Sequence, residues 1–428
     1  MVLESPSKGY LDVGHLELGG TIQSHSSKFI PSDKAEFNRN MLSRNKIISV
    51  CLLLLVITLL GCSRINSAQG WSGILVDDDR LILASMDGHI MVLDKNTGKH
   101  MWEPDLMRVK EKDEKKRAAY GLPAVSNGIL FVGVYSGKIQ AVEVDTGRTV
   151  ETEVVSDDFE IVGGPLIDGE NLYIGAGDGI LRSYNLDFSN EQVTLNDDWE
   201  YEVGGKIWST PIIHDDTLII TSLDHHVYAL NKDTGELLWK AKTGGAVAAT
   251  PVIKDDTVFV GSFDGVFYAF DLNTGEEKWI FEKASNWYWG SAVINDQTIY
   301  IPSLDGKLYA LDIRSGEKEW ELETKGAIVG SPAIVSDMIV VGSTDGEIRI
   351  AEISSGEVLA GCDLGESIQS PITSDGFDVY FSARDHSVRA LTIKTNGKPD
   401  EKWTAPYFSN LLKDDKEPQP IPYKGNTC

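Results

Sequence analysis

Short runs of β-branched and aromatic residues alternate with pairs of turn-forming residues along most of the chain. In the stretch 250–279, the runs Thr257–Val260 and Val266–Phe270 are bounded by the pairs Asp-Asp, Asp-Gly and Thr-Gly. Short apolar runs at hairpin spacing, separated by such turn residues, predict antiparallel strands joined by tight turns. The pattern therefore predicts an all-β protein.

This segment occurs in eight copies, which identifies it as a structural repeat. Counterparts of its Asp264-Gly265 turn follow one another at intervals of 40 to 49 residues, at Asp87-Gly88, Ser136-Gly137, Asp178-Gly179, Asp224-His225, Asp305-Gly306, Asp345-Gly346 and Asp385-His386. Four short strands in a repeat of about 40 residues are typical of a β-propeller blade. We therefore predict one eight-bladed β-propeller with four-stranded antiparallel blades over residues 71–405, which a single chain closes as a monomer.

Several repeats end in the same sequence pattern. The segment Ala269–Trp279 recurs as Leu93–Trp102, Ala229–Trp239 and Ala310–Trp320. It resembles the tryptophan-docking motif of the PQQ-type (pyrroloquinoline-quinone-type) propeller repeat, over nearly all of residues 71–405. The resemblance implies that each tryptophan stacks between neighbouring blades. Six tryptophans fit this structural role: Trp102, Trp199, Trp239, Trp279, Trp320 and Trp403. Repeats 2 and 7 have Glu151 and Ala360 instead, and we expect weaker blade contacts there.

The other four tryptophans point to a candidate binding surface. Trp71, Trp208 and Trp289 lie three residues before the expected start of the innermost strand of their blade. Tyr120 holds the same position in blade 2, and Trp287 lies two residues before Trp289. The remaining blades have Val162, Ala248, Val329 and Ile368 there. Because innermost strands surround the central channel, we expect these rings at one of its mouths. They either plug the channel or bind a peptide strand or flat ligand, since aromatic residues dominate interface anchors.

Residues 41–61 have the features of an export signal. Arg44 and Lys46 precede the apolar run Ile47–Leu60, which is too short to cross a bilayer comfortably but fits the core of a signal peptide. The run ends in Leu-Leu-Gly-Cys, which resembles a bacterial lipobox, so Cys62 is the expected lipid anchor and 62–70 a linker. An uncleaved membrane anchor is the alternative. Residues 1–40 are either an over-extended start before Met41 or a disordered extension.

Composition and charge narrow the class of partner. The chain has 39 basic and 65 acidic residues, a net charge of −26, and 33 − 60 = −27 remains after residues 1–61 are removed. This acidity excludes a nucleic-acid binder, because binding phosphates needs clustered Lys and Arg. Of four cysteines, Cys51 leaves with the signal and Cys62 is the anchor, so Cys362 and Cys428 are either free thiols or one disulfide.

The sequence has few candidates for a catalytic or metal-binding site. The segment Asp271–Glu282 resembles a calcium loop in part, but its glycine is misplaced and a hairpin turn explains the motif. We predict no metal site and no catalytic residues. PQQ-type repeats also occur in quinoprotein dehydrogenases, which implies PQQ with calcium as cofactor under an alternative, enzymatic interpretation. Those enzymes carry adjacent cysteines, which this chain lacks. The basic run Arg108–Arg117 is a solvated loop or a docking loop for an anionic partner.

A lipobox followed by eight PQQ-type repeats resembles the family of propeller lipoproteins in the outer-membrane β-barrel assembly machine. The resemblance implies a non-enzymatic, membrane-tethered scaffold that binds envelope proteins or peptides without a cofactor. Its expected location is extracytoplasmic, at the outer membrane if the organism has one. The irregular segment 406–428, with three prolines, is expected to lie on the exterior of the propeller.

Overall fold

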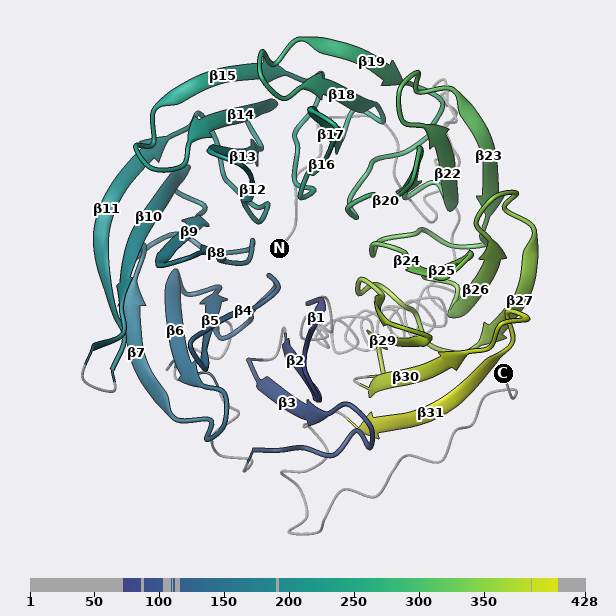
Figure 1. Cartoon of the computed structure of the whole chain (residues 1–428), viewed down its shortest axis with the longest axis horizontal. Helices are drawn as coiled ribbons and strands as arrows, with labels where there is room; N and C mark the ends of the chain where they lie inside the picture. Colours follow the sequence, from purple (N-terminus) through teal and green to yellow (C-terminus); the bar gives the residue numbers. More distant parts are fainter. Residues whose placement is uncertain are drawn as a thin grey trace, which may run out of the picture. The chain divides into compact units, whose positions relative to one another are not determined.

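The computed structural model describes residues 72–85, 88–102, 109, 111, 116–189, 192–385 and 387–406. They belong to one compact unit, Asn66–Cys428, and form eight antiparallel sheets arranged around a central axis (Figure 1). The prediction of an all-β, eight-bladed propeller is confirmed. None of the described residues belongs to a helix that is long and apolar enough to cross a membrane.

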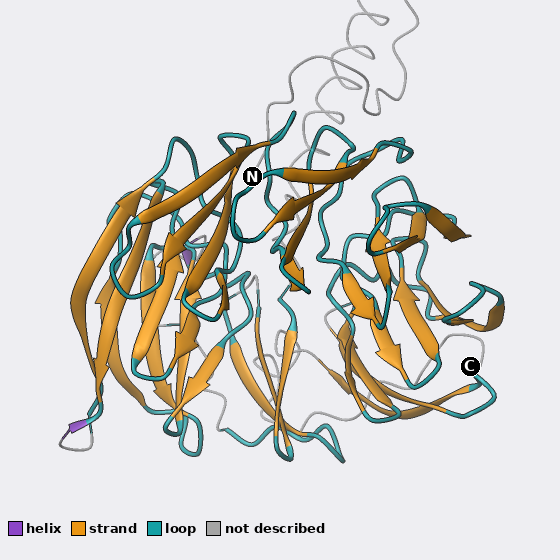
Figure 2. Ribbon diagram, turned by 45° about the horizontal axis from the view of Figure 1, so that its top comes forward, coloured by secondary structure: helices purple, strands orange, loops and turns teal. Residues whose placement is uncertain are grey.

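Every blade is a meander whose strands follow chain order from the axis outwards (Figures 1 and 2). The innermost strands are β1 (Ile74–Asp77), β4 (Ala124–Ser126), β8 (Leu166–Asp168), β12 (Ile212–His214), β16 (Val252–Lys254), β20 (Val293–Asn295), β24 (Ala333–Val335) and β28 (Thr373–Asp375). The second strands are β2 (Arg80–Ala84), β5 (Ile129–Val134), β9 (Asn171–Gly175), β13 (Thr217–Ser222), β17 (Thr257–Gly261), β21 (Thr298–Pro302), β25 (Met338–Gly342) and β29 (Asp378–Ser382).

The third strands are β3 (Ile90–Asp94), β6 (Lys138–Glu143), β10 (Ile180–Asp187), β14 (His226–Asn231), β18 (Phe267–Asp271), β22 (Lys307–Asp312), β26 (Glu347–Glu352) and β30 (Ser387–Ile393). The outer strands are β7 (Thr149–Val154), β11 (Thr194–Glu202), β15 (Leu237–Lys242), β19 (Glu277–Phe281), β23 (Lys318–Glu323), β27 (Val358–Asp363) and β31 (Pro399–Pro406). Among the described residues, the first blade has three strands, and an isolated bridge between Leu93 and His100 lies where its outer strand would pair.

The hydrophobic core lies between the blades. Ile219 and Val227 of blade 4, for example, share one buried cluster with Val258 and Phe270 of blade 5. Equivalent clusters join the other neighbouring blades, because the second and third strands present apolar residues on both faces of the sheet. A single blade could not bury both faces, so the repeats are stable only as a ring.

The ring closes by contacts between blade 8 and blade 1, which come from opposite ends of the described chain. Trp403 donates its indole N–H to the carbonyl oxygen of Lys95 at 3.0 Å, and the Lys95 ammonium pairs with Asp375 at 2.7 Å. Thr373 Oγ1 also donates to the carbonyl oxygen of Ile74 at 2.8 Å. Each described strand pairs only within its own blade, so closure depends on packing between the sheets of blades 8 and 1.

Tryptophans at the outer end of the repeat link five of the blades to the next one. Five indole N–H groups donate to a main-chain carbonyl of the following blade at 2.7–3.1 Å: Trp102 to Val144, Trp199 to Lys232, Trp239 to Leu272, Trp279 to Ile313 and Trp403 to Lys95. Four of these indoles, those of Trp199, Trp239, Trp279 and Trp403, also cover a turn glycine of the following blade. Gly275, for example, has a φ of +72°, and a Cβ there would lie 2.6 Å from the Trp239 ring, so this turn needs glycine.

Trp320 occupies the same position without the same hydrogen bond. Its indole N–H has no acceptor among the described residues, although its ring covers Gly356 of blade 7. The carbonyl oxygen of Ile353, which corresponds to the acceptor in other blades, instead accepts a 3.1 Å hydrogen bond from the Tyr300 hydroxyl. The hydroxyl of the second strand therefore replaces the indole of the outer strand at this interface.

Glu151 and Ala360 stand where the strand register places the docking tryptophan in other blades. Glu151 pairs with Ala141, and Ala360 with Ile350, next to the same bulge that precedes each tryptophan. At blade 7, Leu359 packs against Gly397 of blade 8 in place of an indole. Both interfaces therefore lack the indole hydrogen bond.

Candidate functional site

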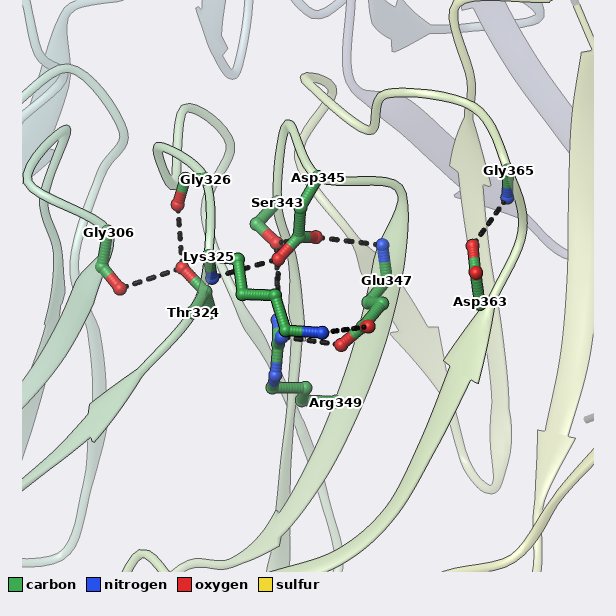
Figure 3. A network of polar contacts seen from close by, with 10 residues as sticks. All are labelled: Gly306, Thr324, Lys325, Gly326, Ser343, Asp345, Glu347, Arg349, Asp363 and Gly365. Carbon is green, nitrogen blue, oxygen red and sulfur yellow. Dashed lines mark hydrogen bonds and ion pairs between the residues drawn. The ribbon is translucent and has the colours of Figure 1, made fainter.

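The connections into the innermost strands and the turns between second and third strands meet on one face of the ring. The turn aspartates hold these two sets of loops together. Asp345 accepts hydrogen bonds from Ser343 and from the main-chain N–H of Lys325, and it pairs with Arg349 at 3.1 Å (Figure 3). Burial raises the pKa of Asp345, but these hydrogen bonds and Arg349 outweigh it and hold the pKa below its ordinary value.

The same arrangement recurs in other blades with either arginine or tyrosine four residues after the aspartate. Arginine follows in three blades and tyrosine in three, in the pairs Asp178–Arg182, Asp345–Arg349, Asp385–Arg389, Asp224–Tyr228, Asp264–Tyr268 and Asp305–Tyr309. The sequence identified these aspartates only as turn residues. His225, which replaces the turn glycine in blade 4, has a φ of +70°, as expected of a turn residue.

A cavity of about 380 Å³ opens at the centre of this face. All eight blades contribute to its wall, with Gly73, Tyr120, Val162, Trp208, Ala248, Trp289, Val329 and Gln369. The structure therefore brings together Tyr120, Trp208 and Trp289, which the sequence placed at one repeat position. All three rings border this cavity.

The wall of the cavity below these side chains is built from small residues and hydroxyl groups. Thr250 Oγ1 accepts a hydrogen bond from the N–H of Thr210, and Thr210 Oγ1 accepts one from the N–H of Gly164. The inner strands approach so closely that a Cβ on Gly290 would lie 2.8 Å from the carbonyl oxygen of Val329. Small residues thus leave the space that the aromatic rings border.

Four aromatic side chains of blades 4 to 6 form a continuous surface, which we call the aromatic shelf: Trp208, Phe263, Trp287 and Trp289. Phe263 stacks between the two tryptophans of blade 6, with ring centroids 4.9 Å from Trp287 and 5.5 Å from Trp289. Trp289 in turn lies 6.5 Å from Trp208. Trp208 is buried, whereas the other three rings are half-buried. Trp287 does not line the cavity itself, and it extends the shelf outwards through Phe263.

Phe263 was missed by the sequence argument. It directly precedes the Asp264-Gly265 turn, and Tyr135 holds the equivalent place in blade 2. Tyr135 lies 5.5 Å from Tyr120 between ring centroids. In blades 2 and 5 the residue before the turn therefore contacts an aromatic side chain of the cavity wall, and a comparison of this repeat position could have revealed both rings.

An ion pair between the buried Glu160 and the partly exposed Lys206 supports the shelf from blade 3. Glu160, with only 8% of its surface exposed, accepts hydrogen bonds from the Lys206 ammonium at 2.7 Å and from the Trp208 indole at 3.3 Å. These contacts fix the orientation of the Trp208 ring. Burial, with smaller contributions from Tyr135 and Glu160, raises the pKa of Tyr120 to about 12. Tyr120 is therefore a neutral hydrogen-bond donor at physiological pH.

The prediction for blade 8 was wrong by one residue. Ile368 is 1% exposed and packs between blades 7 and 8, and Gln369 lines the cavity instead. Blade 8 has one residue fewer between this position and Pro371, so counting back from the proline reached the buried isoleucine. The mouth is consequently aromatic on blades 2, 4 and 6 and polar on blade 8.

Several predicted features lie outside the described residues. They are Trp71, His386, the lipid anchor Cys62, the segments 1–40, 41–61 and 62–70, most of the basic run, and residues 407–428. Strand β31 extends to Pro406, one residue past the predicted end of the propeller. Cys362 is disulfide-bonded, and the other three cysteines lie outside the described part of the chain.

The residues present do not fit a PQQ site with calcium. Within the described residues, no charged side chain lines the cavity, so a tricarboxylate quinone and its Ca²⁺ would lack ionic partners there. No group of three or more His, Cys, Asp or Glu residues in the described ranges could hold a metal ion. At the Asp271 turn, the carboxylate accepts hydrogen bonds from the N–H groups of Asn273 and Thr274, which accounts for that motif as a turn.

Eight minimal four-strand repeats, docking tryptophans and a central aromatic-lined cavity define the class of PQQ-type eight-bladed β-propellers. Residues 66–393 match the family model described as the β-propeller of the beta-alanine-activating enzyme, and the chain belongs to this family.

Solved structures similar to the chain include BamB from Moraxella catarrhalis, with 21% identity and a TM-score of 0.61, covering 75% of this chain and 94% of that one. The quinohemoprotein alcohol dehydrogenase of Comamonas testosteroni is similar at 14% identity and a TM-score of 0.61, covering 76% of this chain and 71% of the enzyme. These likenesses establish the fold. Among curated proteins, the outer membrane protein assembly factor BamB of Francisella salina is 33% identical over 73 residues, 17% of this chain and only 12% of its own length.

Proposed function

We propose that this chain is a membrane-tethered, extracytoplasmic scaffold that binds segments of envelope proteins, and that it acts in outer-membrane protein assembly where an outer membrane exists. The observation that carries the proposal is the uncharged, aromatic-lined cavity that opens beside the aromatic shelf. The assembly role draws support from the similarity to the Francisella assembly factor. The location draws support from the lipobox that ends at Cys62.

The chemistry of the mouth selects among ligands. A charged side chain would lose its hydration without meeting a counter-ion in the lining, which costs several kcal/mol. Aromatic and aliphatic side chains would instead gain contacts with Trp208, Trp289 and Tyr120. Strands of outer-membrane barrels alternate apolar and polar residues and carry aromatic girdles. An extended segment of this kind fits the mouth with its apolar side chains inward.

A pull-down from detergent-solubilised membranes tests the proposal. We expect the wild-type protein to capture barrel proteins and their assembly partners. The variants Trp287→Ala and Trp289→Ala should each weaken this binding by roughly thirtyfold, since large aromatic anchors contribute about 2 kcal/mol. Phe377→Ala, which removes an exposed phenylalanine on the turn before β29, is the matched control and should capture as wild type does.

Two results would contradict the proposal. Unchanged capture by both tryptophan variants, together with a lower melting temperature, would show that the rings only plug the channel. A Cys62→Ser protein that still fractionates with membranes would exclude a lipid tether at that residue. The enzymatic alternative rests on the fold it shares with the Comamonas dehydrogenase. A stoichiometric quinone chromophore after incubation with PQQ and Ca²⁺ would favour that alternative over a scaffold.

A further inference from the structure

The outer strand of blade 7, β27, differs from the other outer strands. It has alanine in place of the docking tryptophan and no charged residue from Val358 to Cys362. The side chains of Val358 and Leu359 are 50% and 44% exposed, respectively. Within the described residues, every other outer strand carries at least one charged residue in its interior.

An uncharged outer strand leaves an edge that needs a cover. Among the described strands β27 pairs only with β26, so its outward N–H and C=O groups have no ladder partner there. Charged side chains are a common protection against unwanted pairing at such edges. Gly397 of blade 8 packs against Leu359, yet much of that side chain stays exposed. We call the exposed side of Val358–Gly361 the blade-7 edge.

Cys362 supplies a covalent attachment next to this edge. It is 2% exposed, packs in the cluster between blades 7 and 8, and is disulfide-bonded. Of the remaining cysteines, Cys51 belongs to the predicted signal and Cys62 is the predicted lipid anchor. Cys428 is then the partner that remains.

We propose that the segment 407–428 covers the blade-7 edge and is fastened there by a disulfide between Cys362 and Cys428. Strand β31 ends at Pro406 on the neighbouring blade, and the segment can extend over roughly 70 Å, which is ample for this path. The disulfide and its segment stabilise the interface that lacks an indole.

Formation of the bond is a thiol–disulfide exchange. The two cysteine thiols give up two protons and two electrons to the disulfide of an extracytoplasmic protein oxidant, which leaves as a dithiol. This step relies on the export stated in the proposed function, because such disulfides persist in oxidising compartments.

Peptide mapping of the native protein, alkylated before non-reducing digestion, tests the pairing. We expect one peptide that joins Cys362 to Cys428, and a linkage to Cys51, to Cys62 or to a second copy would overturn the proposal. Free thiols at both positions would overturn it as well. Lipid on Cys62 is read from the same digest, so failure of the disulfide and failure of the membrane tether are distinguishable.

Hydrogen exchange tests whether the segment covers the edge. In Cys428→Ser, which leaves the buried Cys362 in place, we expect the amides of Val358–Gly361 to exchange at least about tenfold faster, and the melting temperature to fall by roughly 5 °C. The corresponding amides of β23 in blade 6 are the control and should not change. Equal protection of the blade-7 edge in Cys428→Ser and wild type would refute the docking.

Discussion

The indole hydrogen bonds between blades allow a direct comparison of two tryptophans. Trp239 donates to the carbonyl oxygen of Leu272 at 2.7 Å, whereas Trp320 has no acceptor in the described part of the chain because Tyr300 occupies the equivalent carbonyl. Both indoles cover a turn glycine, so Trp→Phe removes a similar apolar contact at each site. Only Trp239→Phe also removes a hydrogen bond and leaves a carbonyl without its donor.

We therefore expect Trp239→Phe to lower the free energy of unfolding by about 1–2 kcal/mol more than Trp320→Phe does. Equilibrium urea denaturation of both variants, followed by circular dichroism, measures this difference. A third variant examines the reason. In the combination of Tyr300→Phe and Trp320→Phe, the Ile353 carbonyl loses both possible donors, so the double variant should be destabilised by more than the sum of the single variants.

Two outcomes would refute this reasoning. Equal destabilisation by Trp239→Phe and Trp320→Phe would show that the apolar contact, and not the hydrogen bond, determines the contribution of these tryptophans. Simple additivity between Tyr300 and Trp320 would show that the two side chains do not compete for one carbonyl.

Three further predictions concern polar groups that are buried or partly buried. Tyr288 is fully buried, and its hydroxyl has no hydrogen-bond partner in the described residues. Because Tyr288→Phe removes this unpaired hydroxyl, it should raise the free energy of unfolding, measured by urea denaturation, by about 1 kcal/mol. A loss of stability would contradict this prediction. Burial raises the pKa of Asp385, but its hydrogen bonds and its ion pair with Arg389 outweigh burial, and the pKa is lowered overall. The ion pair therefore stabilises the fold above about pH 4, and this stabilisation is lost as the pH falls further. Asp385→Asn should therefore be destabilising at pH 7 and lose this difference in a series of melting curves towards pH 2, whereas a constant difference would refute the assignment. Burial, followed by repulsion from Asp197, raises the pKa of Glu153. Glu153→Gln should therefore raise the melting temperature at pH 7, where the glutamate is ionised, and have little effect below about pH 4. An unchanged melting temperature at pH 7 would contradict this prediction.

Some features of the candidate site were accessible from the repeat alignment. The position of Tyr120, Trp208 and Trp289 before the innermost strand placed all three at the cavity, because equivalent positions in a radial repeat share one distance from the axis. The same logic failed at Ile368, where a one-residue deletion shifted the count. Phe263 was not predicted as a site residue, because a single aromatic residue before a turn does not by itself indicate a binding surface.

Other features depended on which side chains meet across blades. The sequence showed that blade 6 has its docking tryptophan, but not that Tyr300 takes the carbonyl that Trp320 would use. It also gave no reason to connect Glu160 with Lys206 and Trp208, since these residues belong to different repeats. Contacts of this kind depend on the relative placement of two sheets, which repeat spacing does not specify.

By itself, the sequence determined the number of blades and the antiparallel order of their strands, because these follow from short apolar runs and from turn residues at a regular interval. It also indicated which blade interfaces lack an indole. The tertiary structure alone decided which partners those side chains find: the aromatic shelf, the Glu160–Lys206 ion pair, the ring closure through Trp403 and the exposed edge of β27. These arise where separate repeats come into contact, and the geometry of that contact is fixed only when all eight sheets pack into one ring.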